Sequence, residues 1–176
     1  MVFKKILVAL DQSPQSQVVF EQALEIAQKE GSHLLLFHSL SWVSEGQWAP
    51  FIGTIADVDM YGAFHHSQRD RLQQEIENVH SWLRTYCQEA NSKNCPAQFD
   101  CKLGDPGLQI CEVASNWGTD VIVVGRRGHR GLSEVLLGSV SNYVLHYAPC
   151  SVLIIQGVKP PIVETSVAAT QGNVSS

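Results

Sequence analysis

Five short, strand-like runs alternate with segments of helical periodicity, and this alternation constrains the fold more than any other feature of the chain. The runs cover residues 4–10, 33–39, 97–103, 120–125 and 151–155. A short, continuous apolar run is typical of a strand that is buried on both faces. Strands that alternate with helices form a parallel sheet with helices on both faces, and right-handed crossovers leave only a few doubly wound orders. We therefore predict a doubly wound α/β fold.

Sequence signals mark the start and the end of two of the expected helices. Ser13-Pro14 has the pattern of an N-cap followed by a first helical position, and Gly31 is a stop signal. Asp105-Pro106 and Gly118 delimit another helix in the same way. The predicted helices span about 14–29, 65–91, 106–117 and 139–147.

Two segments lie outside the alternation. Residues 40 to about 64 have no clean period and include Trp42 and Trp48, so we predict an inserted loop or lid there. The two tryptophans either cover a ligand or, as we favour, pack onto the core. The small and polar residues 157–176 predict a flexible tail. The expected organisation is one domain over residues 1–156, followed by this tail.

Charge and composition narrow the function. A net charge of -5 argues against a nucleic-acid binder, which needs a basic face. No apolar run approaches the roughly 20 residues of a membrane span, and the start MVFKKILVALD reads as a strand instead of a signal peptide. Five cysteines without a C-x-x-C pair favour free thiols over a disulfide or zinc framework. We therefore expect a cytoplasmic protein with no membrane contact.

Ligands of such sheets bind beyond the carboxyl ends of the strands. Asp11, Ser39 and Gly125 end three of the predicted strands and so belong to that edge. Asp11 either binds a ligand or caps the first helix or its turn, and the two roles can coexist. We interpret His38 as a packed histidine; the alternative is a catalytic base. We expect His65-His66 to face solvent; the alternative is a metal-binding role.

The stretch GRRGHRGLSEVLLGSVSN, residues 125–142, follows the fourth predicted strand. It contains neither a P-loop, nor a dinucleotide fingerprint, nor a hydrolase nucleophile elbow. Gly125 and Gly128 leave backbone N–H groups accessible. Gly138-Ser139-Val140-Ser141 places free N–H groups and two hydroxyls at a helix N-terminus, which attracts anions. We predict a phosphate site; the alternative is a flexible, solvated loop that carries charged side chains.

The spacing G-x2-G-x9-G-S, with an Asp at the end of the first strand, resembles the nucleotide-binding branch of the universal stress protein family over residues 3–156. The resemblance implies a five-stranded sheet of order 3-2-1-4-5, in an adenine nucleotide alpha hydrolase-like fold. It also implies ATP or AMP as ligand, and a homodimer or a dimer of dimers that meets along residues 151–155. The residues that it assigns to the nucleotide are Ala9, Leu10, Asp11, Ser39, Val124, Gly125, Arg127, Gly128, Gly138, Ser139, Val140 and Ser141.

The sequence supports catalysis less than it supports nucleotide binding. Hydrolysis needs a positioned base and usually a metal clamp, yet Asp11 is the only carboxylate expected near the phosphates, and the resemblance assigns it to the ribose. We therefore expect a nucleotide-binding protein of stress response or signalling with little turnover, and Mg²⁺ held mainly by the nucleotide's phosphates. The alternatives are a slow ATPase or phosphotransferase, and a nucleotide-free dimer that recruits partner proteins. The intact glycine spacing weighs against the latter.

Overall fold

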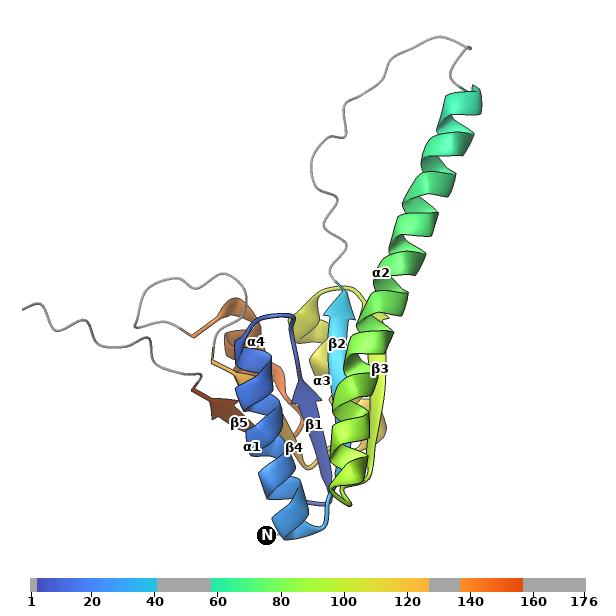
Figure 1. Cartoon of the computed structure of the whole chain (residues 1–176). Helices are drawn as coiled ribbons and strands as arrows, with labels where there is room; N and C mark the ends of the chain where they lie inside the picture. Colours follow the sequence, from blue (N-terminus) through green and yellow to red (C-terminus); the bar gives the residue numbers. More distant parts are fainter. Residues whose placement is uncertain (1–2, 41–57, 127–136, 157–176) are drawn as a thin grey trace, which may run out of the picture.

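The computed structural model describes residues 3–40, 58–126 and 137–156, with the backbone alone for 58–68. Five parallel strands form one sheet in the order β3-β2-β1-β4-β5, which confirms the predicted fold class and order (Figure 1). The elements are β1 (Lys5–Ala9), α1 (Gln15–Glu30), β2 (His33–Leu40), α2 (Val58–Ser92), β3 (Ala97–Leu103), α3 (Pro106–Trp117), β4 (Val121–Gly125), α4 (Ser139–Tyr147) and β5 (Ser151–Ile155).

Helices cover both faces of the sheet, and successive residues of β1 alternate between the two cores. Ile6 and Val8 pack with residues of α1 and α2, whereas Leu7 packs with residues of α3 and α4. All three are fully buried, and each contributes about 1.5–3 kcal/mol through burial. The two edge strands of this sheet are β3 and β5.

The helix boundaries confirm most of the predicted signals. Asp105 caps α3 by accepting a hydrogen bond from the Leu108 N–H at 3.0 Å. Gly118 and Gly31 end α3 and α1 in the left-handed conformation, with φ of 70° and 65°. The prediction for Ser13 is wrong: the N-cap of α1 is Pro14, without a side-chain hydrogen bond. The Ser13 hydroxyl donates to the carboxylate of Asp11 instead.

Helix α2 is longer than predicted. It begins at Val58, so residues 58–64, which we expected in the inserted loop, are helical. Propagating an existing helix adds one hydrogen bond per residue, and this can extend it through a segment without a clear apolar period. The N-terminal part of α2 runs well beyond the carboxyl edge of the sheet (Figure 1). The remainder of the expected insertion, and the tail 157–176, lie outside the described residues.

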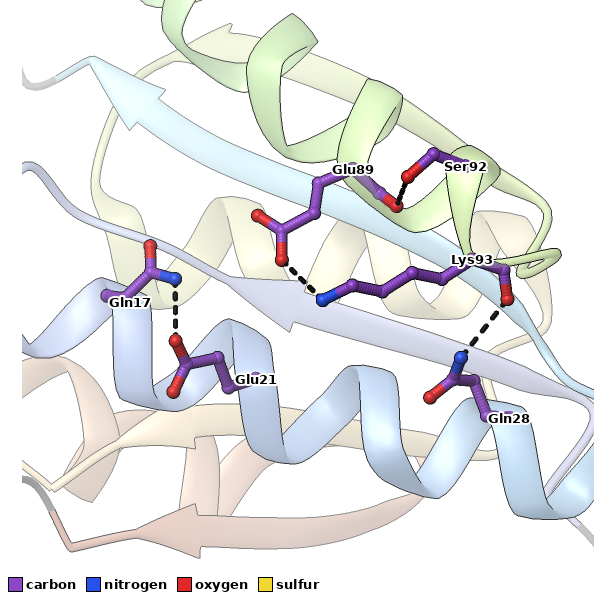
Figure 2. A network of polar contacts seen from close by, with 6 residues as sticks. All are labelled: Gln17, Glu21, Gln28, Glu89, Ser92 and Lys93. Carbon is purple, nitrogen blue, oxygen red and sulfur yellow. Dashed lines mark hydrogen bonds and ion pairs between the residues drawn. The ribbon is translucent and has the colours of Figure 1, made fainter.

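Helices α1 and α2 lie side by side over one face of the sheet. Gln28 of α1 donates a hydrogen bond to the Lys93 carbonyl, just after α2, at 3.1 Å (Figure 2). Lys93 also pairs with Glu89 at 2.8 Å, but such exposed pairs contribute at most about 1 kcal/mol. The contact between the rings of Phe20 and Tyr86, with centroids 4.7 Å apart, lies closer to the core. Apolar packing, more than the polar network, therefore joins the two helices.

The amino edge of the sheet is tied together by Asp120. Its Oδ2 accepts hydrogen bonds from the Lys4 and Lys5 N–H groups at 2.7 and 2.9 Å. These two donors hold the pKa of the Asp120 carboxyl below its ordinary value. The Lys5 ammonium donates to the Trp117 carbonyl at 2.8 Å and lies 5.4 Å from the centroid of that indole ring. The first residues of β1 are thus bonded to the α3–β4 connection.

All five cysteines are unpaired in the structure. Burial raises the pKa of each thiol, to about 11 for Cys87 and Cys101, so these thiols are protonated at neutral pH. Protonated thiols are weak nucleophiles. Within the described segments, no helix combines the length and the apolar character that crossing a membrane requires.

Candidate functional site

Ten of the twelve predicted positions lie in the described residues, at the carboxyl edge of the sheet. Ala9 pairs in register with both Phe37 of β2 and Val124 of β4, so the ends of these three strands are neighbours. Ala9, Leu10, Asp11, Ser39, Val124 and Gly125 stand at these ends, and Gly138, Ser139, Val140 and Ser141 begin α4. Arg127 and Gly128 lie outside the described residues.

Asp11 holds the turn that leads from β1 into α1. Its Oδ1 accepts hydrogen bonds from the Ser13 N–H and the Ser16 hydroxyl, each at 3.0 Å, and from the Ser13 hydroxyl. Ser16 Oγ also contacts the Asp11 carbonyl and accepts the Asp11 N–H at 3.0 Å. Asp11 therefore does hold the turn, as the alternative interpretation expected. Among the described residues, Oδ2 accepts no hydrogen bond.

The buried Ser16 is a residue that the sequence analysis missed. Its hydroxyl fixes both the backbone and the carboxylate of Asp11, so it orients a predicted site residue. The pattern D-x-S-x-x-S over residues 11–16 was visible in the sequence. It is a pattern in which each serine can reach back to the aspartate across one turn.

The end of β2 presents His38 and Ser39. His38 Nδ1 lies 2.8 Å from the Leu10 carbonyl oxygen, and its half-buried ring meets Trp82 of α2 edge-on, with centroids 5.5 Å apart. His38 is therefore a packed histidine, as expected. The Ser39 hydroxyl donates to the Gly104 carbonyl at 3.0 Å, so Ser39 presents its main chain, and not its side chain, to the space between β2 and β1.

The segment between β4 and α4 returns to its starting point. The Gly138 N–H donates to the Arg126 carbonyl at 2.9 Å, and the Ser141 hydroxyl lies 3.0 Å from the same oxygen. Arg126 is in turn bonded through its N–H to the Ile155 carbonyl at 2.8 Å. The two ends of the predicted glycine-rich turn are thus in contact. Of the two hydroxyls expected to face an anion, that of Ser141 is engaged in these internal contacts, whereas Ser139 is exposed.

Helix α4 begins without a side-chain cap. Its N-cap is Gly138, with φ of -61° and ψ of 155°, and its first turn contains no acidic residue. The first helical bond runs from the Asn142 N–H to the Gly138 carbonyl at 2.9 Å. The N–H groups of Ser139, Val140 and Ser141 therefore have no acceptor within the helix. Three such donors, with the positive end of the helix dipole, can bind an anion.

The described residues offer less for catalysis or for a metal ion. They contain no group of three or more His, Cys, Asp or Glu side chains that could hold a metal. Asp105, the other carboxylate that follows a strand at this edge, caps α3 through its Oδ1. The arrangement can bind an anion at α4 and accept a hydrogen bond at Asp11.

Comparisons with known proteins agree on one family. The model of the universal stress protein family matches residues 2–156. Universal stress protein Sll1388 of Synechocystis is 37% identical over 164 residues, which cover 89% of this chain and 99% of the relative. The structure of UspA from Lactobacillus plantarum has a TM-score of 0.70 at 24% identity and covers 88% of this chain and 99% of its own.

Two further similar structures hold nucleotides. A universal stress protein in complex with cAMP has a TM-score of 0.60 at 20% identity, covering 90% of this chain and 100% of its own. The universal stress protein from Archaeoglobus fulgidus in complex with dAMP has a TM-score of 0.58 at 18% identity, with 88% and 99% covered. At these identities the two structures establish a shared fold.

Proposed function

This chain belongs to the universal stress protein family, and from that premise we propose that it binds an adenine nucleotide, ATP or AMP, at the carboxyl edge of its sheet. One observation carries the proposal. The uncapped N-terminus of α4 is held against the end of β4 through Arg126, and β4 pairs with β1, which ends two residues before Asp11. The N-terminus of α4 and Asp11, whose Oδ2 accepts no hydrogen bond from the described residues, thus follow two paired strands at the same edge of the sheet. A nucleotide offers both a phosphate and ribose hydroxyls.

The site residues divide into two ends. Ala9, Leu10 and Asp11 would contact the adenosine, with the Asp11 Oδ2 on the ribose and the main chain of Ser39 on the adenine. Val124, Gly125, Arg127 and Gly128 would surround the ribose and phosphates, and Gly138, Ser139, Val140 and Ser141 would bind phosphate oxygens. The cAMP and dAMP complexes of similar structures support an adenine nucleotide with at least one phosphate.

The proposal expects binding with little turnover, in stress response or signalling in the cytoplasm. Among the described residues no candidate base stands beside α4, and Mg²⁺ would be held mainly by the nucleotide's own phosphate oxygens. Steady-state assays with ATP and Mg²⁺ should give rates far below the 1–100 s⁻¹ typical of kinases. A rate within that range would favour the alternative, an ATPase or phosphotransferase.

The proposal also includes a homodimer, or a dimer of dimers, formed through β5. At the outer edge of β3, side chains occupy two N–H groups: Asn91 accepts from Ala97, and Asp100 accepts from Cys101. At β5 the carbonyl of Ile155 faces β4. Backbone groups alternate along a strand, so the N–H and C=O groups of Val152 and Ile154 face away from the sheet, and no described side chain caps them. Unpaired edges are normally covered. Sedimentation at micromolar concentration that shows only a 19.4 kDa monomer would contradict this part.

The central test asks which nucleotide the protein carries. Mass analysis of small molecules released by acid from the purified protein should show AMP, ADP or ATP. Isothermal titration with AMP and ATP then measures affinity on protein stripped of that ligand. Protein that carries none of the three and binds neither in titration would refute the proposal and favour a nucleotide-free, partner-recruiting dimer.

A further inference from the structure

We infer that His38 is a positioning residue of the adenine end: by bonding the Leu10 carbonyl it ends the β1–β2 ladder one hydrogen bond early and leaves the Ser39 N–H open for the base. The ligand in this inference rests on the proposed function. The early end of the ladder rests on the geometry of the strands alone.

The hydrogen bonds between β1 and β2 follow the regular parallel pattern almost to its end. The His33 N–H donates to the Lys4 carbonyl at 2.8 Å, and the Leu10 N–H donates to the Phe37 carbonyl at 2.9 Å. Bonds in a parallel ladder are evenly spaced and alternate between the strands. The next bond would run from the Ser39 N–H to the Leu10 carbonyl.

The His38 ring takes that place. Its Nδ1 lies 2.8 Å from the Leu10 carbonyl oxygen. A carbonyl only accepts, so Nδ1 must carry the proton and donate it. Within the described residues, the Ser39 N–H is left without an acceptor, although β2 itself continues to Leu40. The two strands stop bonding to each other at the position where the candidate site begins.

Two neighbours hold this arrangement. Trp82 contacts the His38 ring edge-on, with an angle of 85° between the ring planes, and Trp82 in turn meets Tyr86 at 5.6 Å. The Ser39 hydroxyl is committed to the Gly104 carbonyl on the other side of β2. The ring and the backbone are therefore fixed independently of each other, and the open donor points between β1 and β2.

An open N–H in a half-buried position is unfavourable until an acceptor satisfies it. The ring nitrogens of adenine are such acceptors, and the residue that follows Leu10 is Asp11, the expected ribose contact. His38 would thus prepare the donor before the nucleotide arrives. Without the imidazole donor, the Ser39 N–H can complete the ladder with the Leu10 carbonyl and is lost to the ligand.

Two matched variants separate the hydrogen bond from the packing. His38→Asn keeps a donor at nearly the place of Nδ1 but loses the ring. His38→Phe keeps a ring against Trp82 but has no donor. Isothermal titration with AMP should show binding within about twofold of the parent for His38→Asn, and about 5- to 10-fold weaker binding for His38→Phe, the loss expected for one hydrogen bond. Full-strength binding by a folded His38→Phe variant overturns the inference.

NMR on the nucleotide-free parent tests the ladder directly and does not depend on either variant folding. The ring ¹⁵N shifts of His38 should report the Nδ1–H tautomer, and the Ser39 amide should exchange at least about tenfold faster than the Phe37 amide, until AMP protects it. A Ser39 amide as protected as that of Phe37 overturns the inference. If the exchange pattern holds but AMP does not bind, the proposed function and the ligand half are wrong, while the early end of the ladder stands.

Discussion

The amino and carboxyl edges of the sheet both carry glycines and aspartates, but these residues differ in their hydrogen bonding. At the amino edge, Gly31 and Gly118 close α1 and α3 with their N–H groups bonded, and Asp120 accepts the N–H groups of Lys4 and Lys5. At the carboxyl edge, Gly138 begins α4 without a side-chain cap, and the Oδ2 of Asp11 accepts no hydrogen bond from the part of the chain that the structure describes. Most polar groups in folded proteins are satisfied internally. A group of open ones at a single edge indicates a ligand more directly than any single residue type does.

The contrast holds within the carboxyl edge as well. Helices α3 and α4 lie on the same face, and both begin at this edge. The N-terminus of α3 is closed by the Asp105 cap, and a side chain added at Gly107 would collide with Tyr143, 2.7 Å away. That of α4 has neither a cap nor an acidic first turn. The N-cap of α1, at the same edge, also has no side-chain hydrogen bond. The missing cap therefore distinguishes α4 from α3 on this face of the sheet, and we expect the phosphate at α4 because the chain also returns there to the end of β4.

The largest effect on nucleotide binding is expected when a glycine of the carboxyl edge is replaced, and a glycine of the amino edge serves as the control. Gly138→Val should weaken ATP or AMP binding about 100-fold or more, because several N–H contacts to a charged phosphate are blocked and each is worth about 1.5–3 kcal/mol. The φ and ψ of Gly138 are open to any residue, so the variant should fold. Gly128→Val, outside the described residues, should act in the same direction. Isothermal titration with circular dichroism measures both properties.

Gly31→Ala is the matched control at the amino edge. A β-carbon at Gly31 meets nothing within 4 Å, so the cost comes only from its φ of 65°. The free energy of unfolding should fall by about 1 kcal/mol while nucleotide affinity stays unchanged. Parental affinity in a folded Gly138→Val variant would show that α4 is not the phosphate site.

The second effect compares the two aspartates. Asp11→Asn keeps an oxygen for Ser13 and Ser16 but replaces Oδ2 with a donor, so binding should weaken about 10- to 100-fold with little loss of stability. Asp120→Ala should instead lower the free energy of unfolding by about 1 kcal/mol or less, since the group is exposed, and leave binding unchanged. Titration and urea unfolding of both variants test the pair. A stability loss in Asp11→Asn larger than its binding loss would reverse the assignment.

A third, smaller effect concerns acid. The pKa of the Asp120 carboxyl is lowered in the folded protein by the N–H groups of Lys5 and Lys4. A lowered pKa means that the unfolded chain binds the proton more readily, so the stabilisation is present above about pH 4 and is lost as pH falls through the folded pKa. The difference in unfolding free energy between the parent and Asp120→Ala should therefore shrink between pH 5 and 3. A difference that stays constant would show that the charge of Asp120 is irrelevant.

The sequence predicted the strands well because most of them are short apolar runs and residues 97–103 alternate apolar and polar residues. It predicted both ends of α3 because Asp105-Pro106 and Gly118 act locally. The order of the strands came from a family resemblance, not from periodicity. The role of His38 could not be predicted, because its acceptor, the Leu10 carbonyl, is 28 residues away in the chain. The start of α2 was missed because residues 58–64 lack an apolar period. Local signals fixed the elements, whereas the polar contacts of the site depend on the assembled sheet.

The smallest effect is expected from the arginines of the glycine-rich turn, and it tests whether charge or backbone dominates the phosphate end. Arg126 is better left in place, because its guanidinium donates to Gln156 at 2.9 Å and its main chain joins β5 to α4. Replacing Arg127 and Arg130 together by Ala removes two positive charges and keeps the glycine spacing. If the charges act through solvent, each contributes about 0.2–0.5 kcal/mol, the lower part of the range for exposed charges, so ATP binding should weaken about two- to fivefold at low salt. Salt screens such interactions beyond about 10 Å at 0.1 M and about 3 Å at 1 M.

Titrations at 20 mM and 500 mM NaCl should therefore show a difference in ATP affinity between parent and variant that nearly vanishes at high salt, whereas the loss in Gly138→Val persists at both salt concentrations. A double variant as weak as Gly138→Val at 500 mM NaCl would mean that the arginine side chains, and not the open N–H groups of α4, hold the phosphates.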